Sequence, residues 1–287
     1  MSEEAAPTER DPDEQRRIVR ERYAGIAEES DTGCCADDGC GDGATEAEAG
    51  RSPDASDDVG GTGSEQLGYD VEDVAAVADG ADLGLGCGNP KALADLSAGE
   101  TVLDLGAGAG FDCFLAANEV GDGGRVIGVD MTPEMVSKAR DNVAKNDVSN
   151  VEFRLGEIEH LPVADGTVDV LISNCVINLS PAKEQVFAEA FRALRPGGRV
   201  AVSDVVQTAP FPEDVRLDPD SLSGCVSGAA TVGDLETMLA DAGFESIEIA
   251  PNDDSTEFIS EWDDERDLGE FLVSATIEAD KPGTTVQ

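Results

Sequence analysis

The segment VLDLGAGAG, residues 102–110, has the pattern of a buried strand that runs directly into a glycine-rich loop. Gly106, Gly108 and Gly110 allow the backbone to approach a ligand closely at the carboxyl end of that strand. A dinucleotide-binding fingerprint would have its third glycine at position 111, where this chain has Phe111. The spacing therefore predicts a ligand site at the end of this strand, but not an NAD site.

From residue 99 onward, apolar runs alternate with helical patterns. Helices are expected to begin at Thr132-Pro133 and at Ser180-Pro181, the second ending at Pro196, and another helix is expected before Gly243. Strands are expected at residues 101–105, 125–130, 151–155, 168–173, 199–204, 246–250 and 270–278. The alternation predicts an α/β fold with a doubly wound, mostly parallel seven-stranded sheet.

The chain divides into four parts by pattern and composition. A helix is expected over residues 11–29, and the stretch that follows it contains Gly, Asp, Ala, Ser, Thr and Glu with almost nothing to bury. The expected parts are an N-terminal helical arm with Cys34 and Cys35 (1–35), an acidic disordered insertion (36–66), a Rossmann-like ligand-binding domain (67–205) and a C-terminal region that completes the sheet (206–287).

The charge balance excludes several classes of partner. The chain has 62 Asp and Glu residues against 19 Lys and Arg, a net charge of -43, which would repel nucleic acids and anionic membranes. Such acidity is typical of haloarchaeal proteins, because molar salt shortens the Debye length to about 3 Å and screens the self-repulsion. We expect the fold to be lost as KCl is lowered from molar to millimolar concentrations. With no apolar run of 18 residues and an acidic N-terminus, a cytoplasmic location is expected. We also expect the protein to be a monomer.

Two acidic residues accompany the glycine loop. Asp104 lies two residues before Gly106, where a carboxylate can receive the ammonium of a methionine moiety. Asp130 ends the second expected strand, where it can accept both hydroxyls of a ribose. The combination resembles the class I S-adenosylmethionine-dependent methyltransferases and implies S-adenosylmethionine as the cofactor.

The same resemblance covers two further segments. GEIE, residues 156–159, follows the third strand, where these enzymes hold the adenine, and Ser173-Asn174 follows the fourth strand, beside the reacting methyl. For Glu157 and Asn174 a helix or loop cap explains the pattern equally well. The cofactor-binding residues implied are Asp104, Gly106, Gly108, Gly110, Asp130, Met131, Glu157, Ile158 and Asn174.

Three cysteines occupy glycine-rich or strand-end positions: Cys87 in GLGCGNP, Cys175 in SNCVINL and Cys225 in SGCVSGA. No C-x-x-C pair accompanies them and His160 is the single histidine, so a mixed Cys/His zinc site is not predicted. Cys175 is expected at the carboxyl edge of the fourth strand, where thiolates would suit a soft acceptor atom. In their order along residues 17–244, these motifs resemble the arsenite methyltransferase family.

That resemblance implies arsenic detoxification, with arsenite or its thiol conjugates as substrate. Cys87, Cys175 and Cys225 match the family's arsenic-binding thiols, and Cys34 matches a catalytic cysteine in redox cycling, although Cys35 could take its place. Regeneration by a thioredoxin-like protein or a small thiol is implied. Three other residues are expected to take no part in the reaction: Cys40 in the insertion, Cys113 as a small buried hydrophobe, and His160 in a loop.

Two other functions stay open. A class I methyltransferase acting on a small metabolite would have the same cofactor loop, but would leave the positions of three cysteines unexplained. A non-catalytic, thiol-based metalloid-binding protein would use the cysteines without methyl transfer. Cys-to-Ser substitution separates them, because a metabolite enzyme keeps methyl transfer, whereas a sequestering protein loses metalloid binding and never shows transfer.

Overall fold

A computed structural model describes residues 11–29, 67–90, 94–223, 225–263 and 266–283 of the chain. Cys34, Cys35, Cys40 and the expected insertion lie outside the described residues. Within the described part, no helix combines the length and the apolar character needed to cross a bilayer.

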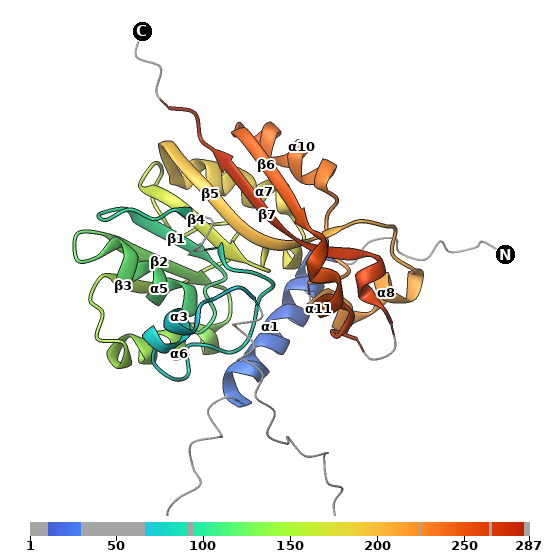
Figure 1. Ribbon diagram of the computed structural model, residues 1–287, viewed down its shortest axis with the longest axis horizontal. Coiled ribbons are helices and arrows are strands. Elements are labelled where there is room, and N and C mark those ends of the chain that lie inside the picture. Colours follow the sequence, from blue (N-terminus) through green and yellow to red (C-terminus); the bar gives the residue numbers. More distant parts are fainter. Residues whose placement is uncertain (1–10, 30–66, 91–93, 224, 264–265, 284–287) are drawn as a thin grey trace, which may run out of the picture.

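A single seven-stranded sheet forms the centre of the described fold (Figure 1). Its strand order is β3-β2-β1-β4-β5-β7-β6; β7 runs antiparallel to both its neighbours, and the other paired strands are parallel. The predicted fold class is confirmed. The strands are β1 Thr101–Leu105, β2 Arg125–Asp130, β3 Val151–Leu155, β4 Val168–Asn174, β5 Leu194–Gln207, β6 Glu245–Asn252 and β7 Leu272–Asp280.

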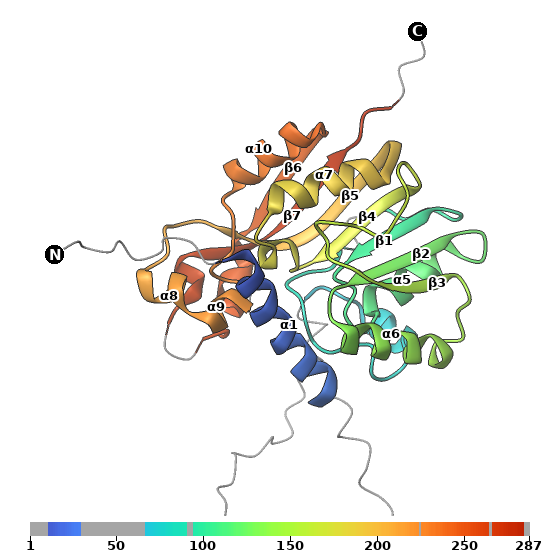
Figure 2. The ribbon, with the colours of Figure 1, turned by 180° about the vertical axis from the view of Figure 1, so that it is seen from behind.

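Helices cover both faces of the sheet (Figures 1 and 2). Helices α5 (Phe111–Val120) and α6 (Pro133–Lys145) pack on one face, and α7 (Lys183–Ala193) and α10 (Val232–Ala242) pack on the other. The remaining elements are α1 Pro12–Glu29, α3 Val71–Ala76, α8 Glu213–Leu217, α9 Pro219–Ser223, α11 Thr256–Ser260 and the 3-10 turns η2 Ile177–Leu179, η3 Asp253–Ser255 and η4 Leu268–Glu270.

Helix α7 is shorter than its sequence pattern predicts. It ends at Ala193, and Leu194 already begins β5, paired with Val168. The residue before a proline is disfavoured in helical conformation because it clashes with the proline ring, which excludes Arg195 from the helix. The predicted end at Pro196 was therefore too late by two residues, Leu194 and Arg195.

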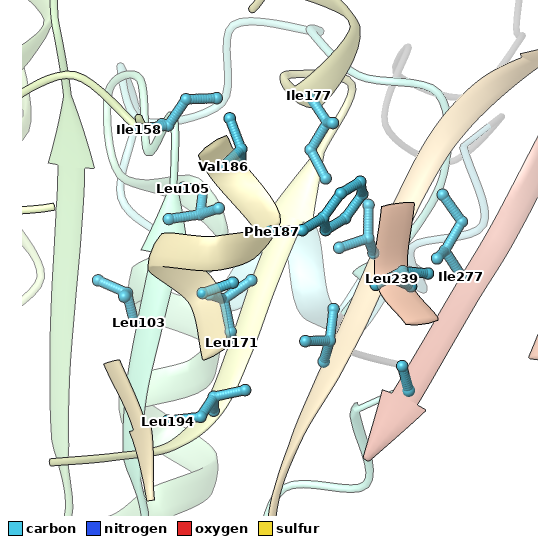
Figure 3. Packing of buried hydrophobic residues seen from close by; sticks show 14 of the residues in the cluster. Leu103, Leu105, Ile158, Leu171, Ile177, Val186, Phe187, Leu194, Leu239 and Ile277 are labelled. Carbon is cyan, nitrogen blue, oxygen red and sulfur yellow. The ribbon is translucent and has the colours of Figure 1, made fainter. Parts of the chain in front are cut away.

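The core lies in two layers, one on each face of the sheet. In Figure 3, Phe187 of α7 lies among side chains of the sheet and of α10, including Leu171, Leu239 and Ile277. On the other face, the rings of Phe114 in α5 and Phe153 in β3 meet edge to face, with centroids 5.7 Å apart. Full burial of a side chain of this size contributes roughly 1.5–3 kcal/mol, so both helix layers are held firmly on the sheet.

Helix α1 lies across the carboxyl edge of the sheet, between α6 and α9 (Figure 2). Its contacts with the rest of the fold include polar ones: the side chain of Gln15 donates to the carbonyl of Leu179 at 3.0 Å, and Lys138 Nζ donates to the carbonyl of Ala27 at 3.3 Å. The loops that follow β1, β2, β3 and β4 therefore face a helix from the N-terminal part of the chain.

Candidate functional site

A cavity opens between these loops and α1, with about 1060 Å³ of space when the part open to solvent is included. Sequence reasoning predicted several of its lining residues: Asp104, Gly106, Gly108, Asp130, Met131, Ile158, Asn174 and Cys175. Others were not predicted: Arg16, Val19, Tyr23, Asp112, Glu159 and Ser180. The cavity therefore brings the glycine loop, the strand-end acids and one cysteine together at a single edge.

The glycine loop forms one wall. Gly106 has a φ of +70°, and a Cβ atom there would lie 2.4 Å from Val176 Cγ2, so position 106 requires glycine. Gly108 lines the cavity, and its N–H donates to Asp130 Oδ2 at 3.0 Å. Gly110, the N-cap of α5, has a φ of +99°, and a Cβ there would lie 2.6 Å from the Phe153 ring.

Five carboxylates line the cavity: Asp82, Asp104, Asp112, Asp130 and Glu159. Asp104, Asp112 and Asp130 come from β1, α5 and the end of β2. Burial raises the pKa of Asp104 well above its usual value, and the charge of Asp112 raises it further, while a hydrogen bond from Cys113 Sγ at 3.2 Å opposes the shift. Burial also raises the pKa of Asp130, although its carboxylate accepts from the N–H of Thr132 at 2.8 Å. A cationic ligand would offset these effects and favour the charged carboxylates.

Cys113 has a more specific place than the sequence predicted. It is fully buried on α5, as expected of a small hydrophobe, but its thiol touches the proposed cofactor acid Asp104. Asp112, the residue before it, was missed although it lies in the first helical turn after the glycine loop. That position, directly after a loop expected to hold a ligand, was the available signal.

Glu157 and its neighbours meet α1. The carboxylate of Glu157 pairs with Arg16 at 3.7 Å and with Arg20 at 3.5 Å, rather than joining the cavity lining described here. Glu159, 3% exposed, lines the cavity, pairs with Arg16 at 3.5 Å and accepts from Ser180 Oγ at 2.7 Å. The sequence predicted the helix but not that Arg16 would form part of the cavity wall.

The three cysteines expected to bind arsenic lie together. Cys87 and Cys175 are joined by a disulfide, and Cys225 Sγ donates to the carbonyl of Cys175 at 2.6 Å. All three are buried, and among them Cys175 is the one that lines the cavity. The turn between β4 and η2 presents Cys175 with a φ of +54°. Segments far apart in sequence therefore bring the three cysteines together, with Cys175 at the cavity edge.

An apolar shell surrounds these cysteines. Val19 of α1, Val205 of β5 and Leu272 of β7 belong to the same buried cluster, and the C-terminal region adds the aromatic pair Phe258 and Trp262, with ring centroids 5.5 Å apart. Tyr23 of α1 is hydrogen-bonded to Cys225. Each of the three cysteines is 7% exposed or less, so the shell leaves little of them open to solvent.

Asp204, in β5, lies against the disulfide and is 1% exposed. One of its carboxylate oxygens and the sulfur atoms of Cys87 and Cys175 lie within 4.8 Å of one another. Its carboxylate accepts from the N–H of Ile177 at 3.1 Å and from the side-chain amide of Asn178 at 2.8 Å. Asp204 therefore holds the turn that follows Cys175.

Burial raises the pKa of Asp204 to about 6, against about 3.9 for an unfolded aspartate. The fold thus favours the protonated carboxyl, and the stability that Asp204 contributes is present below about pH 4 and lost as pH rises through about 6. The quantity to compare is the difference between the unfolding free energies of the wild type and Asp204→Asn. We expect this difference to be smaller at pH 7 than at pH 4.5 by roughly 1–3 kcal/mol. Urea unfolding of the oxidised proteins in molar KCl measures it, and a flat difference would contradict the assigned shift.

Comparisons with known proteins find methyltransferases. A family model described as a methyltransferase domain matches residues 96–243. An arsenite methyltransferase of Halobacterium salinarum is 68% identical over 282 residues, which cover 97% of this chain and 70% of that protein. One of Aquipseudomonas alcaligenes is 43% identical over 150 residues, 50% of this chain and 43% of that protein.

A solved structure agrees with them. The crystal structure of an arsenic(III) S-adenosylmethionine methyltransferase from Chlamydomonas reinhardtii matches with a TM-score of 0.57 and 32% identity, covering 79% of this chain and 75% of that one. This match covers more of the chain than the methyltransferase-domain model, which is limited to residues 96–243.

Proposed function

The chain belongs to the arsenite methyltransferase family of class I S-adenosylmethionine-dependent enzymes, and we propose that Cys87, Cys175 and Cys225 hold trivalent arsenic while it is methylated. The protein is an S-adenosylmethionine-dependent arsenite methyltransferase. The observation that most directly supports the proposed site is the meeting of these three cysteines at the edge of the cavity that Asp104 lines.

The cavity suits S-adenosylmethionine in charge and in shape. Its carboxylates match the ammonium and sulfonium charges, and Gly106 and Gly108 line it without a side chain. When bound, S-adenosylmethionine supplies an electrophilic methyl group on its sulfur. In this proposal Asp104 receives the ammonium, Asp130 accepts the ribose hydroxyls, and Glu157 contributes by holding Arg16 in the cavity wall.

The remaining residues of the proposed cofactor site act through position. Met131 and Ile158 supply apolar surface for the adenine, and the backbone at Gly106, Gly108 and Gly110 shapes the loop. Asn174 fixes the end of β4, beside the reacting centre. None of these residues has to transfer a proton.

Three thiolates suit trivalent arsenic, a soft centre that exchanges hydroxide or small-thiol ligands for sulfur. Bound by three sulfur atoms it is pyramidal and keeps a lone pair, which is the nucleophile for the methyl group. The step needs positioning rather than a general base. This agrees with a chain whose single histidine, His160, is exposed.

Binding and turnover require a redox cycle. The described protein has Cys87 and Cys175 as a disulfide, so two electrons must reduce it before these sulfur atoms can bind arsenic. Methylation formally oxidises arsenic, and two thiols that become a disulfide return two electrons to it. We propose Cys34, or its neighbour Cys35, for this exchange, with a thioredoxin-like protein or a small thiol as the reductant.

Reduction is therefore expected to switch the activity on. Oxidised protein with arsenite and S-adenosylmethionine in molar KCl should give no methylated arsenic above the enzyme-free background, and addition of a phosphine reductant should give multiple turnovers. Separation and counting of the arsenic species measures both. If reduced, folded, cofactor-binding protein forms no methylated arsenic, the acceptor is another molecule and the proposed site is wrong.

We further propose the setting in which the enzyme acts. A haloarchaeal cytoplasm agrees with the net charge of -43 and with the match to the Halobacterium salinarum protein. We propose that the enzyme detoxifies arsenic and that it acts as a monomer. We also propose that the chain is divided into the four parts 1–35, 36–66, 67–205 and 206–287. Gel filtration with light scattering in molar KCl tests the oligomeric state.

A further inference from the structure

Tyr69 is a buried polar residue that the cofactor and arsenic sites leave without a role. It lies just before α3, is 4% exposed, and its ring meets that of Phe111 edge to face with centroids 5.0 Å apart. Its hydroxyl donates to Asp112 Oδ1 at 2.6 Å and accepts from Asn174 Nδ2 at 3.1 Å. Tyr69 therefore connects two residues of the cavity lining, Asp112 and Asn174, through its hydroxyl.

Asn174 connects this tyrosine to the arsenic-binding loops. Its Oδ1 accepts from the N–H of Cys87 at 3.0 Å, and its Nδ2 donates to the carbonyl of Gly88 at 2.7 Å. A Cβ at Gly86 would lie 2.6 Å from the same amide, so the loop packs directly on it. Since Asn174 also precedes Cys175 in the chain, one side chain sets the position of the Cys87 loop relative to the end of β4.

Asp112 connects the tyrosine to the cofactor side. It lines the cavity close enough to Asp104 for its charge to act on that carboxyl. A cation that binds at this acidic end of the cavity attracts both carboxylates. Any shift or tightening of Asp112 acts on the Tyr69 hydroxyl, because a 2.6 Å hydrogen bond to a carboxylate is strong and directional.

The direction of each hydrogen bond determines how Asp112, Tyr69 and Asn174 influence one another. A phenol has one O–H to donate, and here Asp112, which as a carboxylate can only accept, takes it. The Tyr69 oxygen is then left as an acceptor, which orients the Nδ2 of Asn174 toward it and the Oδ1 toward the N–H of Cys87. The hydroxyl of Tyr69 thus acts together with the Gly88 carbonyl and the Cys87 N–H to set which way the Asn174 amide faces.

We propose that Tyr69 is a positioning residue that couples occupancy of the acidic end of the cofactor cavity to the arrangement of the Cys87 and Cys175 loops. The inference rests on the proposed function, because it takes the cysteines as the arsenic site and the cavity as the cofactor site. By linkage the coupling is reciprocal: cofactor tightens arsenic binding by the same factor by which arsenic tightens cofactor binding.

The test measures binding without turnover. Arsenite affinity of the reduced protein is measured in molar KCl, with and without saturating S-adenosylhomocysteine, which carries no methyl group to transfer. We expect the wild type to bind arsenite at least about fivefold more tightly with the nucleoside present, within the usual range of coupling between sites. Tyr69→Phe keeps the ring contact with Phe111 and removes both hydrogen bonds. The ratio of its arsenite affinities with and without S-adenosylhomocysteine should therefore fall to within about twofold of one.

Two further variants make the result specific. Asp112→Asn acts at the other end of the 2.6 Å hydrogen bond and should also lower the ratio. Asn150→Ala is the matched control, because its side chain donates to the carbonyls of Ala117 and Gly121, at 3.2 and 3.0 Å, at the opposite edge of the sheet. Its ratio should equal that of the wild type.

The outcomes separate the inference from the function on which it rests. Wild-type protein that binds neither arsenite nor S-adenosylhomocysteine overturns the proposed function and the inference with it. Wild-type protein that binds both with a ratio of one overturns the coupling alone. A wild-type ratio retained in Tyr69→Phe leaves the coupling standing and overturns the assignment to Tyr69.

Discussion

Cys175→Ser should lower the rate of arsenic methylation by at least about 100-fold. Cys175 is the one of the three proposed arsenic ligands that also lines the cofactor cavity, so its sulfur is the ligand nearest the methyl donor in this proposal. A serine hydroxyl keeps the size but is a hard ligand that stays protonated, which a soft arsenic centre does not favour. Arsenic species formed by the reduced variant in molar KCl, separated and counted, give the rate.

Two controls define this result. Cys175→Ser should bind S-adenosylhomocysteine as the wild type does, since none of the proposed cofactor contacts is altered. Cys40→Ser, a change of the same chemistry at a position expected to be incidental, should keep the wild-type rate. Undiminished methylation of arsenic by Cys175→Ser would remove that thiol from the mechanism and favour a metabolite as the natural acceptor.

Asp104→Asn should weaken the binding of S-adenosylmethionine by about 10- to 100-fold, the range expected for loss of a charge-assisted hydrogen bond. Asn keeps the shape of Asp104 in a position that is 3% exposed, so packing beside Cys113 is preserved while the negative charge is lost. Titration calorimetry on the reduced protein, with S-adenosylmethionine and S-adenosylhomocysteine in turn, measures the change.

The matched control neutralises a carboxylate away from the cavity. Asp165, which is 80% exposed, pairs with Arg192 at 2.7 Å, so Asp165→Asn changes the net charge equally and should leave cofactor affinity unchanged. Arsenite binding in the absence of cofactor should also be the same for Asp104→Asn and the wild type. Equal affinity for S-adenosylmethionine in Asp104→Asn and the wild type would show that another group receives the ammonium.

The elements that were predicted correctly have local signals. The apolar runs that became β1 to β4 and the glycine loop are readable because burial and backbone conformation act on neighbouring residues. The same reasoning extended α7 too far, since the pairing of Leu194 with Val168 depends on a distant strand. Residue type and strand-end position also found Asp104, Asp130 and Cys175, all of which line the cavity.

What was missed depends on tertiary contacts. The sequence of α1 has a helical pattern, but this pattern gives no indication that Arg16 and Tyr23 line a cavity formed by loops much later in the chain. Glu157 follows a strand as a cofactor residue would, yet α1 provides two arginines that pair with it. Tyr69 has no motif around it, and its role is visible only through its two hydrogen-bond partners.

The position of β7 has a consequence for synthesis of the chain. β7 lies between β5 and β6, so β6 has no strand to pair with until residues 272–280 have left the ribosome. Ser274 of the same strand donates to the carbonyl of Cys87 at 2.9 Å, which fixes the thiol loop at this late stage as well. A nascent chain therefore lacks a complete sheet, and its Cys87 loop lacks the contact with Ser274, until β7 has emerged from the ribosome.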